Sequence, residues 1–281
     1  MPTLDRGNAQ IHWEEVGSGT AVLTTHGLTE NATYWSLTGI TAALAAHHRV
    51  ISMDMRGHGR TRVDGAPHGF DVETLGDDLE ALADHLGLGR FHLLTHATGG
   101  MVGVRYAMRP RARLASLILT DTGSATAITP GDPETRRRAM SQFAASFEGR
   151  GWDEILQRTR KHPGPFLFRL DQHPERERLW GIVERIFRLG DPDTIARFIR
   201  SFYADPDPQV EGLRRIRCPT LVLLGEHDVL FVEPSRLMAR EIPRARWALL
   251  GGVGHMTAIE DPERTTHAIL EFLADVEAGR A

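Results

Sequence analysis

Residues 93–101 read Leu-Leu-Thr-His-Ala-Thr-Gly-Gly-Met. An apolar run leads into a tight turn, and a helix that starts with small residues follows. This pattern is typical of a nucleophile elbow, whose usual sequence is G-x-S-x-G. Thr95 stands at the first glycine position, Ala97 at the serine position and Gly99 at the last glycine position. The sequence therefore predicts the turn that presents a nucleophile, without the hydroxyl that would attack.

Short apolar runs alternate with helical patterns on both sides of this turn. We expect strands at residues 10–16, 20–25, 49–54, 90–95, 114–120, 220–224 and 246–250. We expect helices at residues 35–46, 71–86, 98–108, 234–241 and 261–275. Alternation of this kind predicts an α/β fold with a mostly parallel, doubly wound sheet and helices on both faces.

The alternation stops between the strands expected at 114–120 and 220–224. Residues 123–133 are rich in glycine, proline, serine and threonine, which is typical of a loop. Residues 134–213 show helical stretches rich in aromatic residues and no convincing strand. We therefore expect a helical cap over residues 123–214, inserted into a core made of residues 1–122 and 215–281. Most of its aromatic residues would form the cap's own core, and a few would line a pocket.

Four motifs in register carry a resemblance to a known family. They are a strand ending in His-Gly at 22–28, a D-x-R-G-x-G turn at 50–61, the elbow at 93–101, and an acid turn at 221–228 followed by Gly-Val-Gly-His at 252–255. From near residue 10 to near residue 275, the chain resembles an α/β-hydrolase, with nucleophile, acid and histidine in the family's order. Since dehalogenases and epoxide hydrolases of this fold need a carboxylate at the position of Ala97, the resemblance disfavours them.

The resemblance implies a catalytic triad with one altered member. His255 would be the base, Asp228 would hold its other ring nitrogen, and Ala97 occupies the nucleophile position. Asp121, which ends the strand before the expected cap, is the alternative acid, because some members of the fold place the acid there. We favour Asp228, since the Gly225-x-x-Asp228 arrangement is the commoner one.

The resemblance also assigns an oxyanion hole. Its two donors would be the backbone N–H groups of Leu28, just after the His-Gly pair, and Thr98, just after the nucleophile position. His26 and His96 flank the expected cavity and would either orient the substrate or hydrogen-bond the loops. Trp35 would either wall the pocket or belong to the core at a helix start.

The alanine at position 97 has three explanations. One is a Ser→Ala change introduced to trap a ligand, in a parent that hydrolyses a small or medium carboxylic ester or lactone. Another is cofactor-independent His/Asp proton transfer, as in the oxygenases and hydroxynitrile lyases of this fold. The third is a natural binding module without catalysis. Because His255, Asp228, Gly27 and Gly99 all remain, we favour the first, which predicts that the present chain is inactive or strongly impaired.

Composition excludes other classes of function. With a net charge of −4, the chain has no basic footprint for nucleic acid. No segment approaches the about 18 apolar residues of a membrane span, and the N-terminus lacks a signal core. We therefore expect a cytoplasmic protein that acts on a small molecule, binds neither nucleic acid nor membrane, and uses no cofactor or metal. The single cysteine, Cys218, excludes an internal disulfide.

Overall fold

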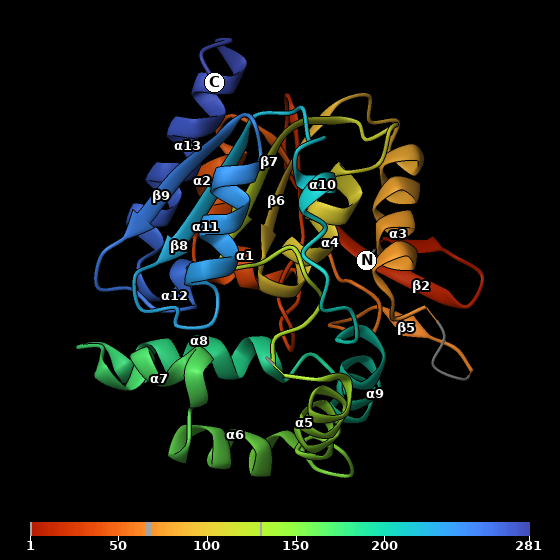
Figure 1. Cartoon of the computed structure of the whole chain (residues 1–281), viewed down its shortest axis with the longest axis vertical. Coiled ribbons are helices and arrows are strands. Elements are labelled where there is room, and N and C mark those ends of the chain that lie inside the picture. Colours follow the sequence, from red (N-terminus) through yellow and green to blue (C-terminus); the bar gives the residue numbers. More distant parts are fainter. Residues whose placement is uncertain (1, 66–68, 130) are drawn as a thin grey trace.

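The computed structural model describes residues 2–65, 69–129 and 131–281, which form one sheet covered by helices (Figure 1). The nine strands are β1 (Thr3–Asp5), β2 (Ala9–Gly17), β3 (Ala21–Thr24), β4 (Arg49–Met53), β5 (Arg62–Val63), β6 (Phe91–His96), β7 (Leu114–Thr120), β8 (Thr220–Gly225) and β9 (Ala245–Leu250). Their order in the sheet is β1-β2-β4-β3-β6-β7-β8-β9, and β5 pairs with β2.

The sheet is parallel from β4 to β9. β3 pairs with β4 and β6 in parallel, and the β6–β7, β7–β8 and β8–β9 pairs are parallel as well. β2 runs antiparallel to its neighbours β1, β4 and β5. The prediction of a mostly parallel sheet is confirmed, while the short strands β1 and β5 give no apolar signal of their own and were not expected.

Helices cover both faces of the sheet, because the central strands are apolar on both sides. In β7, Leu117 and Leu119 belong to one hydrophobic core and Ile118 to the other. The first face packs against α3 (Val72–His85), α4 (Ala97–Ala107) and α11 (Val232–Glu241). The second packs against α1 (Thr33–Leu37), α2 (Ile40–Ala45) and α13 (Pro262–Glu277).

One helix differs from its prediction. The helix expected at residues 35–46 is two short helices, α1 and α2, separated at Gly39. Gly39 has φ of 85°, a left-handed conformation that interrupts the helix and that glycine adopts without a Cβ penalty.

A layer of five helices lies between β7 and β8 in the chain: α5 (Pro133–Ala145), α6 (Trp152–Lys161), α7 (Gly164–Gln172), α8 (Arg176–Phe187) and α9 (Pro192–Phe202). Figure 1 shows this helical layer below the sheet, at the end where β6 runs into α4. The short α10 (Val210–Leu213) leads back to β8. Between β7 and β8, the described part of the chain contains no strand. The boundaries expected for a separate cap stay a prediction.

None of the described helices combines the length and the apolar character that crossing a bilayer requires.

Candidate active site

The elbow forms where β6 ends at His96 and α4 begins at Ala97. Ala97 has φ of 45°, a left-handed conformation that costs a non-glycine residue about 1–2 kcal/mol. Thr122 holds this turn, since its hydroxyl donates to the carbonyl oxygen of Ala97 over 2.6 Å. Ala97 is 6% exposed and lines a cavity. The chain therefore keeps the strained backbone of an elbow with a methyl group at its tip.

Gly99 lets the start of α4 approach the His-Gly loop (residues 26–31). A Cβ on Gly99 would lie 2.5 Å from Oγ1 of Thr25 and 2.6 Å from the carbonyl oxygen of His26. In place of that Cβ, the backbone N–H of Gly99 donates to the same carbonyl oxygen over 3.0 Å. The glycine thus fixes how closely the elbow and the His-Gly loop lie together.

The structure brings His255 and Asp228 together across 27 residues of sequence. Nδ1 of His255 lies 2.8 Å from Oδ2 of Asp228, and both side chains are buried. Because the carboxylate accepts a hydrogen bond from Nδ1, the other ring nitrogen, Nε2, is the one left for proton exchange with a ligand. His255 and Ala97 line the same cavity.

Asp121, the alternative acid, has other partners. Its carboxylate accepts hydrogen bonds from the backbone N–H of Gly225 at 3.0 Å and from the hydroxyl of Thr257 at 2.6 Å. Burial raises the pKa of Asp121 to about 7, and the nearby His96 opposes that rise. Asp121 thus ties the end of β8 to the start of α12 (Thr257–Glu260), while Asp228 contacts the ring of His255.

The two backbone donors expected for an oxyanion hole point to no protein acceptor. Within the described residues, neither the N–H of Leu28 nor that of Thr98 makes a hydrogen bond. Both residues line the cavity beside Ala97. Free N–H groups at a helix start and a tight loop are suited to bind a developing negative charge.

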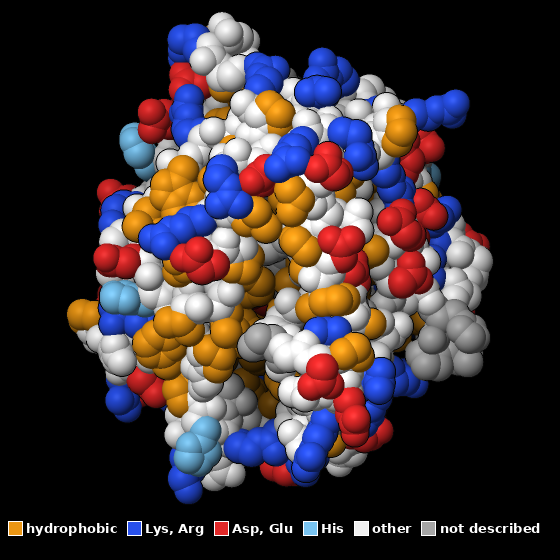
Figure 2. All heavy atoms as spheres, viewed as in Figure 1, with side chains coloured by type: hydrophobic (Ala, Val, Ile, Leu, Met, Phe, Trp, Pro, Cys, Tyr) orange, Lys and Arg blue, Asp and Glu red, His pale blue; other side chains and the backbone are white. Residues whose placement is uncertain are grey.

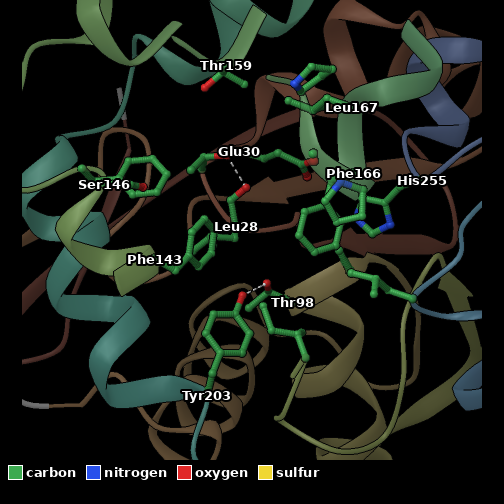
Figure 3. A pocket seen from close by; sticks show the side chains of 18 of the residues that line it. Leu28, Glu30, Thr98, Phe143, Ser146, Thr159, Phe166, Leu167, Tyr203 and His255 are labelled. Carbon is green, nitrogen blue, oxygen red and sulfur yellow. Dashed lines mark hydrogen bonds between the residues drawn. The ribbon is translucent and has the colours of Figure 1, made fainter. Parts of the chain in front are cut away.

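The cavity lies between the sheet and the helical layer, and its volume is about 660 Å³. Its walls are mainly apolar, and aromatic rings from both sides contribute: Phe143, Phe147, Phe166, Phe187, Tyr203 and Phe231. Figure 3 shows Phe166 next to His255, and their ring centroids are 4.7 Å apart. In the view of Figure 2, hydrophobic side chains surround a hollow between the two layers. The site therefore suits a largely apolar ligand.

The structure assigns His26 and Trp35 to holding loops. The Nδ1 of His26 donates to the carbonyl oxygen of Gly27, and its Nε2 accepts from the backbone N–H of Met55. Burial lowers the pKa of His26 well below its usual value. The fully buried Trp35 donates from Nε1 to the carbonyl oxygen of Thr25 over 2.9 Å. Neither residue is among those that line the cavity.

His96 also lies behind the cavity wall, where it carries a positive charge. Its Nδ1 lies 2.9 Å from Oε2 of Glu30, and its Nε2 lies 3.0 Å from the carbonyl oxygen of His255. Both partners are acceptors, so both ring nitrogens must donate. Burial alone would lower the pKa of His96, but the charge and hydrogen bond of Glu30 raise it to about 9.

Two residues of the site were not predicted. Glu30 is buried and lines the cavity, although a glutamate in a loop is usually exposed. Tyr203, at the end of α9, shares a 2.6 Å hydrogen bond with the hydroxyl of Thr98 (Figure 3). Only one of the two hydroxyl hydrogens is needed for this bond, so the second hydroxyl can donate its hydrogen to a ligand in the cavity. Neither Glu30 nor Tyr203 belongs to a local sequence motif. Their roles become visible only from their contacts with distant segments, at His96 and Thr98.

Among the described residues, no group of three or more His, Cys, Asp or Glu side chains has an arrangement that could hold a metal ion.

Comparisons with known proteins agree with this fold. The family model described as the alpha/beta hydrolase fold matches residues 20–262. The putative carbamate hydrolase RutD of Caulobacter sp. (strain K31) is 29% identical and covers 97% of both chains. A thermophilic esterase from Thermogutta terrifontis is 30% identical, with a TM-score of 0.75 over 98% of this chain and 97% of its own. The enol-lactonase from Burkholderia xenovorans LB400 shares the fold at 24% identity, with a TM-score of 0.80 over 97% of this chain and 100% of its own.

The sheet is mostly parallel, an elbow follows β6, and a His–Asp pair lies on the loops after β8 and β9. These features are those of a protein with the α/β-hydrolase fold. This chain belongs to the α/β-hydrolase fold family, and relatives over its whole length are named as hydrolases.

Proposed function

We propose that this chain has the site of a hydrolase for a small or medium acyl compound, a carboxylic ester, a lactone or a carbamate. The observation that carries the proposal is the hydrogen-bonded His255–Asp228 pair beside a cavity that also holds Ala97. Two backbone N–H groups that make no hydrogen bond to any described residue, those of Leu28 and Thr98, belong to residues that line the same cavity. The carbamate is included because relatives of full length are named as putative carbamate hydrolases.

In the parent mechanism, a serine at position 97 supplies the nucleophile. Nε2 of His255 takes the hydroxyl proton as the oxygen attacks the carbonyl carbon, and Asp228 stabilises the resulting imidazolium. The N–H groups of Leu28 and Thr98 hold the oxyanion of the tetrahedral intermediate. His255 then protonates the leaving group, and a water molecule, deprotonated by the same nitrogen, cleaves the acyl-enzyme.

With Ala97 the first bond cannot form. Loss of the serine in such a site lowers kcat by about six orders of magnitude. The present chain therefore binds its acyl ligand and turns it over very poorly. The helical layer acts as a cap that closes the apolar cavity over the ligand and excludes water.

The experiment is the Ala97→Ser variant, assayed with p-nitrophenyl esters of increasing chain length, with lactones and with carbamates. The expected result is turnover that the original chain lacks and that a second change, His255→Ala, removes. If Ala97→Ser gains no turnover on any of these compounds, the proposal is wrong.

A second candidate function is proton transfer by His255 and Asp228 without a covalent nucleophile. It is favoured by the intact His–Asp pair in a chain that lacks the serine. This function requires the present chain to be active and His255→Ala to abolish that activity. A pure binding module would instead hold its ligand equally well with alanine or serine at position 97. Comparing the original chain with both variants separates all three.

A further inference from the structure

The carboxylate of Glu30 is satisfied on one oxygen only. Oε2 accepts from the backbone N–H of Gly27 at 2.5 Å and from Nδ1 of His96 at 2.9 Å. Within the described residues, Oε1 makes no hydrogen bond. Oε1 is not fully enclosed and keeps a small accessible surface. Since the side chain is 3% exposed and lines the cavity, the small surface of Oε1 faces that cavity.

Glu30 lies beside the reacting position. If Gly27 had a Cβ, that atom would lie 2.9 Å from Oε2 of Glu30 and 3.1 Å from the methyl carbon of Ala97. The backbone N–H of Leu28, which finds no acceptor in the described part of the chain, belongs to the same loop. The carboxylate of Glu30 therefore adjoins the place where the scissile carbonyl group would bind.

Glu30 is the one carboxylate among the described residues that line the cavity. A ligand that displaces water from Oε1 without offering a donor leaves a charged acceptor unpaired, which is the costly case for a buried hydrogen-bonding group. A ligand with an N–H or O–H group at that point satisfies it. Figure 3 shows Glu30 among the side chains that line the cavity. The apolar walls leave the rest of such a ligand free to be hydrophobic.

We infer that Glu30 selects acyl compounds with a hydrogen-bond donor within two bonds of the scissile carbonyl carbon. The N–H of a carbamate and the O–H of an α-hydroxy ester both meet this requirement. This inference rests on the proposed function, because that function makes the ligand an acyl compound. The inference concerns the binding of that compound and not its turnover.

The test measures equilibrium binding to the original chain, in which Ala97 prevents turnover, by titration calorimetry. Two matched pairs of probes differ by one methyl group that removes the donor. They are methyl N-phenylcarbamate against its N-methyl derivative, and methyl mandelate against its O-methyl ether. Because a hydrogen bond to a charged group is worth about a factor of ten or more in affinity, the donor-bearing member of at least one pair should bind at least tenfold tighter. The two pairs show whether the nitrogen or the oxygen donor is preferred.

In Glu30→Gln the amide oxygen has to face the two donors at Gly27 and His96, so the amide NH2 group, a donor, replaces Oε1 toward the cavity. This change should reduce the preference to within about twofold. The matched control is Glu260→Gln. Glu260, at the end of α12 (Thr257–Glu260), is also a buried glutamate; it accepts backbone N–H bonds from Gly254 and Met256 and does not line the cavity. The control should keep the preference. If Glu30→Gln does not fold, Glu30→Asp, which withdraws the carboxylate by one methylene, should weaken the preference instead.

Equal affinities within both pairs for the original chain would overturn the inference, and so would a preference that survives in Glu30→Gln. Failure of the proposed function gives a different result. If Ala97→Ser gains no turnover while the original chain still prefers the donor-bearing probes, the hydrolase proposal fails and the role of Glu30 stands.

Discussion

The ring of His96 donates a hydrogen bond from Nε2 to the main-chain carbonyl oxygen of His255, 3.0 Å away. From its other nitrogen, the same ring donates to Glu30 on the His-Gly loop. One imidazolium at the elbow thus connects the loop that carries an oxyanion donor with the loop that carries the histidine. His96 therefore acts as a positioning residue for the two sides of the site, without touching the cavity.

His96→Phe should destabilise the fold by about 3–5 kcal/mol, because it leaves the buried charge of Glu30 without its counter-ion. Phenylalanine keeps a ring that can stack on Tyr34, whose centroid lies 4.5 Å from that of His96. The free energy of unfolding from urea titrations measures the effect. His267→Phe, at a side chain that is 82% exposed, is the control and should change stability by less than about 0.5 kcal/mol. Equal stabilities of the two variants would contradict the charged role of His96.

The stabilisation by His96 should depend on pH in a defined window. Its pKa is raised from 6.5 in the unfolded chain to about 9 in the folded one, so the folded state binds the proton more tightly. The contribution is therefore full below pH 6.5 and is lost as the pH rises through about 9. The difference in unfolding free energy between the original chain and His96→Phe should shrink across this window. A difference that stays constant from pH 6 to pH 9.5 would show that the ring is neutral throughout.

Gly99→Ala should destabilise the chain by about 1–3 kcal/mol, because the new Cβ would meet a backbone carbonyl oxygen that cannot rotate away. Gly89→Ala is the matched control, since nothing lies within 4 Å of its added Cβ and its backbone conformation is ordinary. Thermal unfolding of both variants measures the difference. Comparable melting temperatures for the two would mean that the His-Gly loop yields more easily than its hydrogen bonds suggest.

The parts of the fold with strong local signals were predictable from sequence. The strand expected at 114–120 is β7 (Leu114–Thr120), because a run buried on both faces is continuously apolar. The elbow was predictable even without its serine, since small residues and glycines around Ala97 are dictated by close backbone packing. The break at Gly39 was missed because the apolar spacing continues across it, while a single left-handed residue ends the helix.

The site was predictable only where residue type and turn sequence coincide. His255 and Asp228 each follow a strand in a glycine-containing turn, and the resemblance of these turns to those of the α/β-hydrolases predicted that they meet. Glu30 and His96 are 66 residues apart, and their pairing depends on how the His-Gly loop packs on the elbow. Whether His96 faces a substrate or a loop could not be read from its position in the sequence. The carboxylate of Glu30 holds the ring of His96 against the His-Gly loop, and no sequence motif marks Glu30.

Asp228→Asn, made in the Ala97→Ser background, should lower kcat by about 10⁴, because an amide at this position favours the wrong tautomer of His255. Asp121→Asn in the same background should lower stability but reduce kcat far less, since Asp121 bonds Gly225 and Thr257 and makes no hydrogen bond to the histidine ring. Steady-state kinetics on an ester that Ala97→Ser hydrolyses, with unfolding curves for each variant, separate the two carboxylates. A larger kcat loss for Asp121→Asn than for Asp228→Asn would make Asp121 the acid of the site and the Asp228 contact structural.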